Sequence, residues 1–231
     1  DSPDAWNPVT IAKTEMGTEG APAGWGKIDA IRIAAWRGGK TPSAFLIANA
    51  ARISPEAPIV IVRGDWAGRQ HAAESRAILE AKRTTARLLD DLGLDYAVIS
   101  DEDLTEQRLA GRKALLLPYN PAMPDAAAAC LRRFTQAGGG LVSFFRLPPA
   151  LQEASGIRAV RSISHERPGH FAQIQAAPNV SPGMPPLTRQ MSWNIEVVEP
   201  IGGKGRIAAY WHDDTGKNTG HPAVLITDRA A

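Results

Sequence analysis

The regular alternation of short apolar runs with amphipathic stretches over residues 58–147 constrains the fold most strongly. Runs of β-branched and aliphatic residues begin at Pro58, Leu94, Lys113 and Leu141. Continuous apolar runs of this length are typical of strands that are buried on both faces of a parallel sheet. The repeated strand and helix pattern therefore predicts an α/β fold, namely a flavodoxin-like three-layer sandwich with a mostly parallel sheet.

Apolar spacing and capping residues indicate the helices between these strands. Residues 72–93 carry an apolar stripe at helical spacing, and Gly93 stands where a left-handed C-cap belongs. Residues 124–139 begin with proline and aspartate and end with glycine, which predicts a second helix. The acidic stretch 101–109 predicts a short helical or loop connection.

The sequence changes character after the fourth apolar run. Residues 150–192 are rich in Pro, Gly and Ser, which predicts an irregular insertion with short strands. The later runs IEVVEP, GRIAAYWHDD and AVLIT predict a β-rich, antiparallel C-terminal segment. We therefore expect one α/β domain over residues 58–231, with the insertion at about 150–192.

Residues 1–57 are expected to form an N-terminal extension, and the sequence leaves its structure open. Its apolar runs at 28–36 and 44–51 suggest a strand and, for the second run, a strand or a short helix. The first residue is Asp1 rather than Met. If Asp1 follows a removed signal peptide, a secreted or periplasmic location is expected; an excerpt of a longer chain is the alternative.

Composition narrows the functional classes. The chain is 44% hydrophobic and 22% charged, with a formal net charge of +2, and its basic residues are scattered rather than concentrated as in nucleic-acid-binding proteins. No apolar run reaches the roughly 18 residues of a membrane span. The single cysteine, Cys130, rules out an internal disulfide and a cysteine-based zinc cluster. We expect no nucleic acid, membrane, cofactor or metal as a partner.

The run GRKALLLPYNPAMPDAAAACLRRFTQAGGGLVSFFR resembles the class I glutamine-amidotransferase-like domain attached to some glycoside hydrolases, in particular the trimerisation domain of bacterial β-galactosidases. The tail RIAAYWHDDTGKNTGHPAVLIT is similar to the corresponding segment there. The resemblance covers residues 58–150 and 193–228. It implies an accessory or assembly domain of a carbohydrate-processing protein, with a homo-oligomer and a carbohydrate as the expected partners.

The same resemblance places a cysteine nucleophile at the tip of the strand after the glycine turn in true amidotransferases. Here the tip is Phe145 or Arg146, depending on alignment by one residue, and neither can attack a carbonyl group. Cys130 lies within the Ala-rich helix and is expected to pack as a small apolar side chain. Glutamine amidotransferase activity is therefore not expected, and no catalytic residue is assigned.

Polar and aromatic residues follow the predicted strands at the edge where open α/β sheets bind ligands. One interpretation is a polar pocket with an aromatic wall, suited to a sugar or another small polar ligand. The other, which we favour, is an Asp–Arg ion pair that ties loops together. The candidate ligand-binding residues are Arg63, Asp65, Trp66, Tyr119, Asn120 and Arg146.

Two further functions remain open. A small hydrolase could use Asp65 with His165 or His170 of the SHERPGH loop as an acid–base pair. A ligand-binding module could instead use Arg146 as an anion clamp.

Overall fold

The computed structural model describes residues 56–178 and 183–228, together with Ile11, Met16, Gly17, Ile33, Val180 and Ala230. Apart from Ile33, the runs at 28–36 and 44–51 lie outside the described residues, and so does most of the predicted extension 1–57. The chain divides into two units, Asp1–Ala50 and Ala51–Ala231, and every element below belongs to the second.

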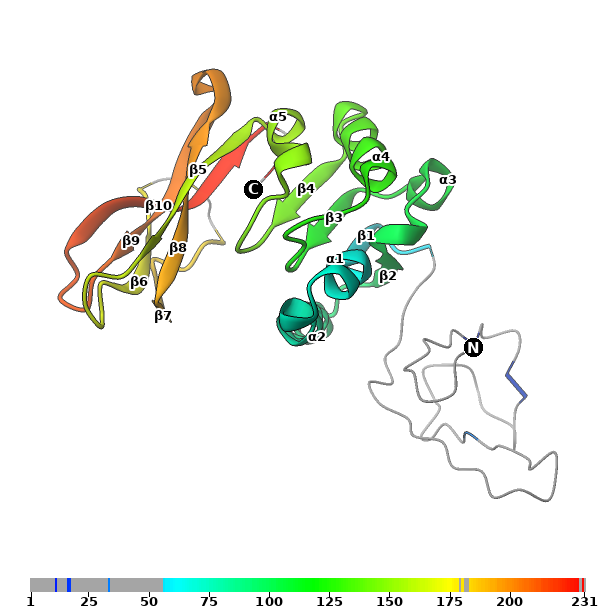
Figure 1. Cartoon of the computed structure of the whole chain (residues 1–231), viewed down its shortest axis with the longest axis horizontal. Helices are drawn as coiled ribbons and strands as arrows, with labels where there is room; N and C mark the ends of the chain where they lie inside the picture. Colours follow the sequence, from blue (N-terminus) through cyan, green and yellow to red (C-terminus); the bar gives the residue numbers. More distant parts are fainter. Residues whose placement is uncertain are drawn as a thin grey trace. The chain divides into compact units, whose positions relative to one another are not determined.

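In the described part of the chain, four parallel strands form one sheet in the order β2-β1-β3-β4 (Figure 1). β1 pairs with both β2 and β3, so it lies inside the sheet. The strands are β1 Ile59–Arg63, β2 Tyr96–Ser100, β3 Ala114–Leu117 and β4 Gly140–Ser143. All four were predicted from the apolar runs.

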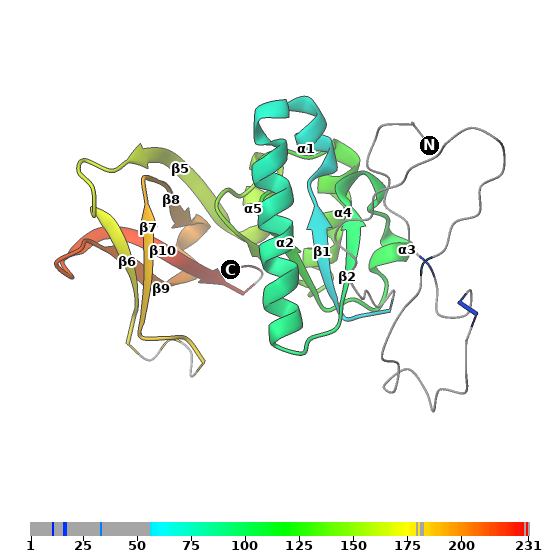
Figure 2. The ribbon, with the colours of Figure 1, turned by 90° about the horizontal axis from the view of Figure 1, so that it is seen from below.

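Alternate side chains of the inner strands are buried on opposite faces of this sheet. Val60 and Leu115 pack in a core cluster with residues of α4, Asp125–Gln136. Ile61 and Leu116 point the other way and pack with residues of α2, Ser75–Asp91. Figure 2 shows α2 crossing one face of the sheet. The predicted three-layer α/β sandwich is confirmed.

Short elements connect the strands to these two helices. α2 ends as predicted, because Gly93 has a φ of 66° and the Leu94 N–H donates to the Leu89 carbonyl at 2.9 Å. The remaining short elements are α1 Asp65–Gln70, the 3₁₀ turns Ala72–Glu74 and Asp101–Asp103, and α3 Glu106–Leu109. The stretch predicted as a short helical or loop connection is thus a 3₁₀ turn followed by α3.

The C-terminal segment is antiparallel and rich in strands, as predicted for the residues from Trp193 onward. Strands are also present between residues 157 and 192, within the stretch predicted to be irregular with short strands. β10, β9, β6 and β7 form one sheet and β5 pairs with β8, while Phe171, Ile195 and Trp211 share one apolar cluster. The elements are the 3₁₀ turn Pro149–Leu151, α5 Gln152–Ser155, β5 Ile157–Ser164, β6 Phe171–Ala176, β7 Leu187–Ser192, β8 Asn194–Pro200, the 3₁₀ turn Ile201–Gly203, β9 Gly205–His212 and β10 Asn218–Thr227. The expected division into a domain and an insertion at about 150–192 stays a prediction.

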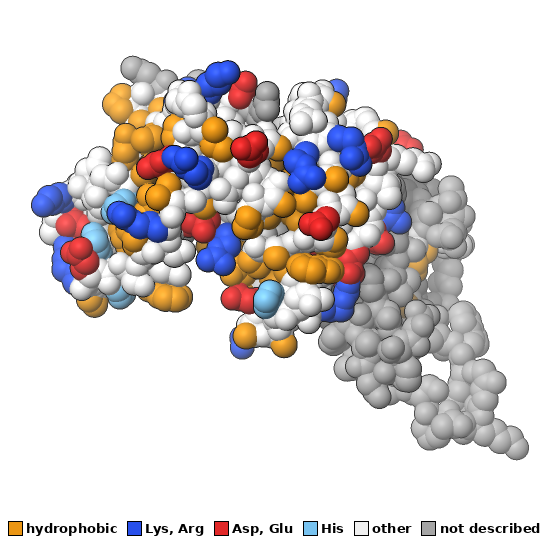
Figure 3. Space-filling model, turned by 45° about the horizontal axis from the view of Figure 1, so that its top comes forward, with side chains coloured by type: hydrophobic (Ala, Val, Ile, Leu, Met, Phe, Trp, Pro, Cys, Tyr) orange, Lys and Arg blue, Asp and Glu red, His pale blue; other side chains and the backbone are white. Residues whose placement is uncertain are grey.

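The C-terminal segment is joined to the parallel sheet by hydrogen bonds. Ala230 forms a parallel bridge with Leu141 of β4. Within the C-terminal segment, the Thr227 hydroxyl donates to the Ser155 carbonyl at 2.7 Å and so connects β10 to α5. On the face shown in Figure 3, basic and acidic side chains are interspersed. In the part of the chain that the structure describes, no helix is long and apolar enough to cross a membrane.

Candidate functional site

The loops that leave β1, β3 and β4 meet beyond the carboxyl ends of the strands. The chain moves from β1 to β2 on one side and then returns to β3 on the other side of β1, which makes this point the topological switch of the sheet. We call the three segments that directly follow these strands, residues 64–66, 118–120 and 144–146, the carboxyl edge. It contains five of the six predicted site residues, and Arg63 is the last residue of β1.

Gly64 allows the loops after β1 and β3 to approach closely. A β-carbon added at Gly64 would lie 3.1 Å from Nδ2 of Asn120 and 3.1 Å from the carbonyl oxygen of Tyr119. Asn120 is fully buried, and neither polar atom of its side chain has a hydrogen-bond partner within the described residues. A buried amide without hydrogen bonds lowers the stability of the folded state. The side-chain amide of Asn120 is such a group in the loop after β3.

The predicted Asp–Arg ion pair takes a different form in the structure. Nε of Arg63 donates to both oxygens of Asp65, at 2.7 and 2.8 Å, so this pair lies within one strand end. Arg146 instead donates from Nε to Oε1 of Glu196, at 3.3 Å. Asp65 and Arg146 therefore have separate partners, and only the second pair joins the carboxyl edge to another element, β8. The ligand-binding role of these residues stays a prediction.

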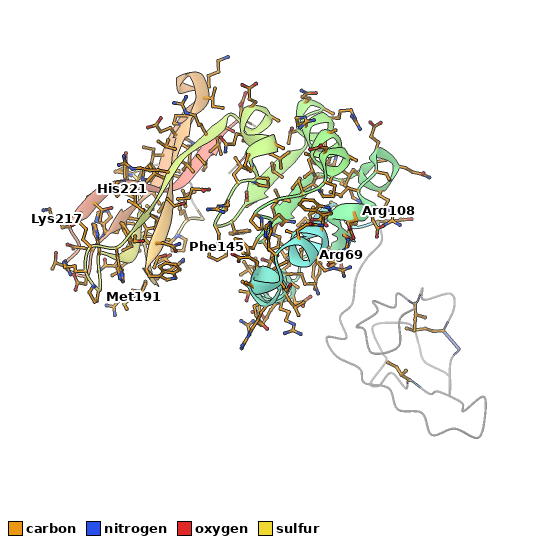
Figure 4. The ribbon with its side chains drawn as sticks, viewed as in Figure 1. Arg69, Arg108, Phe145, Met191, Lys217 and His221 are labelled. Atoms are coloured by element: carbon orange, nitrogen blue, oxygen red, sulfur yellow. The ribbon has the colours of Figure 1, made fainter. Side chains whose placement is uncertain are left out.

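Trp66 is placed through its backbone. Its N–H donates at 3.0 Å to Oδ1 of Asp101, which is 1% exposed. Burial raises the pKa of Asp101 to about 6, against the lowering effect of the hydrogen bond from Trp66. Next to it, Glu102 forms an ion pair with Arg69 of α1; Figure 4 labels Arg69. Asp101 thus acts as a distant cap for the first turn of α1, a role that the sequence analysis did not anticipate.

Tyr119 joins the loop after β3 to the 3₁₀ turn before α2 and to the loop after β4. Its hydroxyl donates to Oε2 of Glu74 at 2.9 Å, and its ring meets that of Phe145 edge-on, with centroids 6.0 Å apart and planes at 80°. Burial, followed by the hydrogen bond to Glu74, raises the pKa of Tyr119. The phenol therefore keeps its proton, which it donates to Glu74.

The tip of β4 has an unusual backbone. Phe145 has a φ of 62° and is the only non-glycine residue with a positive φ among the described residues. The left-handed conformation costs a non-glycine residue roughly 1–2 kcal/mol. The ring is 71% exposed, so burial does not offset this cost. The residue at the tip is thus Phe145 rather than Arg146, and its side chain has no nucleophilic atom.

None of the other candidate reactive groups, Cys130, His165 and His170, lies at the carboxyl edge. Cys130 is 3% exposed within α4, and burial raises the pKa of its thiol, which confirms its expected packing role. His170 stacks on Phe171 at 4.3 Å, and its Nδ1 accepts the Glu166 N–H at 3.1 Å. Among the described hydrogen bonds, neither His165 nor His170 contacts Asp65. In the described residues, no cluster of three or more His, Cys, Asp or Glu is arranged to hold a metal.

This architecture also occurs in solved structures. The chain aligns with the β-galactosidase from Rahnella sp. R3 at a TM-score of 0.54 and 18% identity, over 77% of this chain and 27% of that one. It aligns with a ThuA-like protein from Bacteroides uniformis ATCC 8492 at a TM-score of 0.52 and 13% identity, over 80% of this chain and 82% of that one. The chain has a class I glutamine amidotransferase-like fold. It spans only about a quarter of the β-galactosidase.

No protein-family model and no curated protein sequence matches the chain. The amidotransferase-like fold is therefore established by structure, at identities that carry no information on activity. The tip of β4 is where the backbone of this chain departs from the usual conformations of a non-glycine residue. The left-handed backbone is present there, and the side chain is a phenylalanine.

Replacing Phe145 by glycine and by alanine isolates the backbone strain. Both variants lose the ring, but only glycine adopts a φ of 62° without steric cost. We expect Phe145→Gly to have a free energy of unfolding about 1 kcal/mol higher than Phe145→Ala, as measured by urea denaturation. Equal stability, or a more stable alanine variant, would contradict the left-handed conformation.

Asp101 should make stability depend on pH. The folded state binds its proton more tightly than the unfolded state, because its pKa is about 6 instead of 3.8. The contribution of Asp101 to the free energy of unfolding therefore falls as the pH rises from about 4 to 6, by up to about 3 kcal/mol. Asparagine does not titrate, so this contribution is absent from Asp101→Asn. As the pH rises from about 4 to 6, the free energy of unfolding of the variant should therefore increase relative to that of the wild type.

Urea denaturation of both proteins at several pH values from 4 to 7 measures this difference. The exposed Asp103 lies in the same 3₁₀ turn, and Asp103→Asn controls for the loss of a charge. A stability difference between the wild type and Asp101→Asn that stays constant with pH, or changes in the opposite direction, would rule out a raised pKa at Asp101.

Proposed function

We propose that this chain is a non-catalytic, amidotransferase-like accessory domain of a carbohydrate-processing protein of the glycoside hydrolase type. The observation that carries the proposal is Phe145, which takes the strained backbone of the strand tip without a nucleophilic atom. Covalent catalysis at such a tip needs a nucleophile, an adjacent base and a group that orients the base. The carbohydrate context is supported by the structural similarity to part of a β-galactosidase.

An assembly role is supported by apolar side chains at the end of α2. Leu88, Leu92 and Leu94 are 50%, 62% and 44% exposed, and Leu88 and Leu92 are neighbours on the helix surface. Contiguous exposed apolar groups are characteristic of interaction surfaces. We infer that a second copy of the chain covers this leucine patch, which would make the domain a homo-oligomer.

The second candidate function is a sugar-binding module at the carboxyl edge. It is favoured over a small hydrolase because Asp65 is engaged by Arg63 and has no hydrogen bond to a histidine in the described part of the chain. A proton-transferring pair needs its two groups within hydrogen-bond reach, directly or through one water molecule. The exposed ring of Phe145 provides the surface that a sugar would need.

The non-catalytic proposal predicts that the purified chain releases no ammonia from glutamine above the rate without protein. A coupled glutamate dehydrogenase assay measures this release. Cys130→Ala is the control, since Cys130 is the only thiol in the chain. Ammonia release by the wild type that disappears in Cys130→Ala would show that a cysteine nucleophile operates, and the proposal would fail.

The assembly proposal predicts self-association through the leucine patch. Replacing Leu88 and Leu92 together by glutamate should raise the dissociation constant about tenfold or more in sedimentation-velocity experiments, because apolar burial is lost. Leu79→Glu is the matched control: Leu79 is 38% exposed on the opposite side of α2, at about 3.6 residues per turn. A wild-type monomer at all concentrations, or equal effects of both substitutions, would contradict this surface.

A further inference from the structure

The left-handed turn at Phe145 has no structural need for a phenylalanine. Glycine occupies every other described position with a positive φ, including Gly93 and Gly156 at helix ends. Phenylalanine at such a position is disfavoured by the backbone, and an exposure of 71% means that little packing compensates it. A strained residue of this kind points to a function outside folding.

The surroundings of the ring leave room for a ligand on it. The perpendicular contact with Tyr119 can use no more than one face of the Phe145 ring. Figure 4 shows Phe145 on the loop beyond β4. Two aromatic rings at right angles form a corner, with Phe145 as the exposed surface and the half-buried Tyr119 as the wall.

The polar group beside this corner favours a neutral ligand. Arg146 is 50% exposed and uses Nε for Glu196, whereas its two terminal nitrogens have no hydrogen-bond partner among the described residues. These terminal N–H groups can donate to hydroxyl oxygens. Because Glu196 is only 13% exposed, its carboxylate offsets the guanidinium charge from the protein side. A polyol can accept hydrogen bonds from these N–H groups. An anion would be attracted less strongly, because the Arg146 guanidinium is already paired with Glu196.

We propose that Phe145 is the stacking surface of a saccharide subsite, with Arg146 as the hydroxyl-binding group and Tyr119 as the wall. A pyranose ring presents a face of C–H groups that packs against an aromatic ring, and its hydroxyl groups lie around the rim, where Arg146 can donate to them. The inference deepens the carbohydrate context of the proposed function and rests on it. It assigns the ligand class and the residues of the subsite.

Ligand-observed NMR and isothermal titration calorimetry with lactose, cellobiose and maltose test the subsite on the full chain. We expect at least one of these disaccharides to bind the wild type, and Phe145→Ala to weaken that binding about fivefold to tenfold. Phe145→Tyr keeps the stacking surface and should bind within about twofold of the wild type. Arg146→Ala should weaken binding while leaving the stacking surface in place.

Two variants keep the test specific. Phe144→Ala removes the neighbouring, 37% exposed ring, and Trp193→Ala removes an exposed ring after β7; both should bind like the wild type. Circular dichroism establishes that each variant is folded. The subsite is refuted if none of the disaccharides binds, if Phe145→Ala binds as tightly as the wild type, or if citrate competes with the sugar at the Arg146 side chain. A failure here leaves the absence of ammonia release unaffected, so the two proposals can fail separately.

Discussion

Burial of the central strands on both faces is the constraint on which the rest of the structure depends. Val60, Ile61 and Val62 of β1 are fully buried, so β1 needs a helical layer on each side. The helices can reach opposite faces only if the chain reverses its direction of winding between β1 and β3. The loops after these strands are then forced together at their carboxyl ends. The position of the candidate site is therefore a consequence of core packing.

The carboxyl edge is held by polar contacts that the core does not require. Asp101 caps α1 across the loop after β1, Glu74 accepts a hydrogen bond from Tyr119, and Glu196 pairs with Arg146. Each contact joins segments that are distant in the sequence. These contacts also carry a cost, because buried carboxyl groups lose hydration, as the raised pKa of Asp101 indicates. An edge of this kind is rigid enough to hold a strained residue in place.

Most of the fold could be predicted from the sequence, because strands that are buried on both faces of a sheet consist of continuous apolar runs. The strand tip was located to within one residue, between Phe145 and Arg146, since the run ends just before two prolines. The contacts of the site could not be found in the same way. Trp66 and Asp101 are 35 residues apart, and Arg146 and Glu196 are 50 apart, so their pairing depends on tertiary packing. Glu196 in particular looks like any polar residue of an alternating strand.

The strained turn is maintained by constraints on both of its sides. Before it, the Phe144 N–H donates to the Leu117 carbonyl at 3.0 Å, which fixes the end of β4 against β3. Within it, the Arg146 N–H donates to the Phe144 carbonyl at 2.7 Å, and the Ser143 hydroxyl donates to the Arg146 carbonyl at 3.3 Å.

After the turn, Pro148 and Pro149 restrict the path of the chain, and Glu196 holds Arg146 from β8. Because these contacts fix the backbone, they determine the conformation at position 145 whichever side chain is present there. The backbone at the tip is therefore set by its neighbours, and the side chain of Phe145 is presented to solvent.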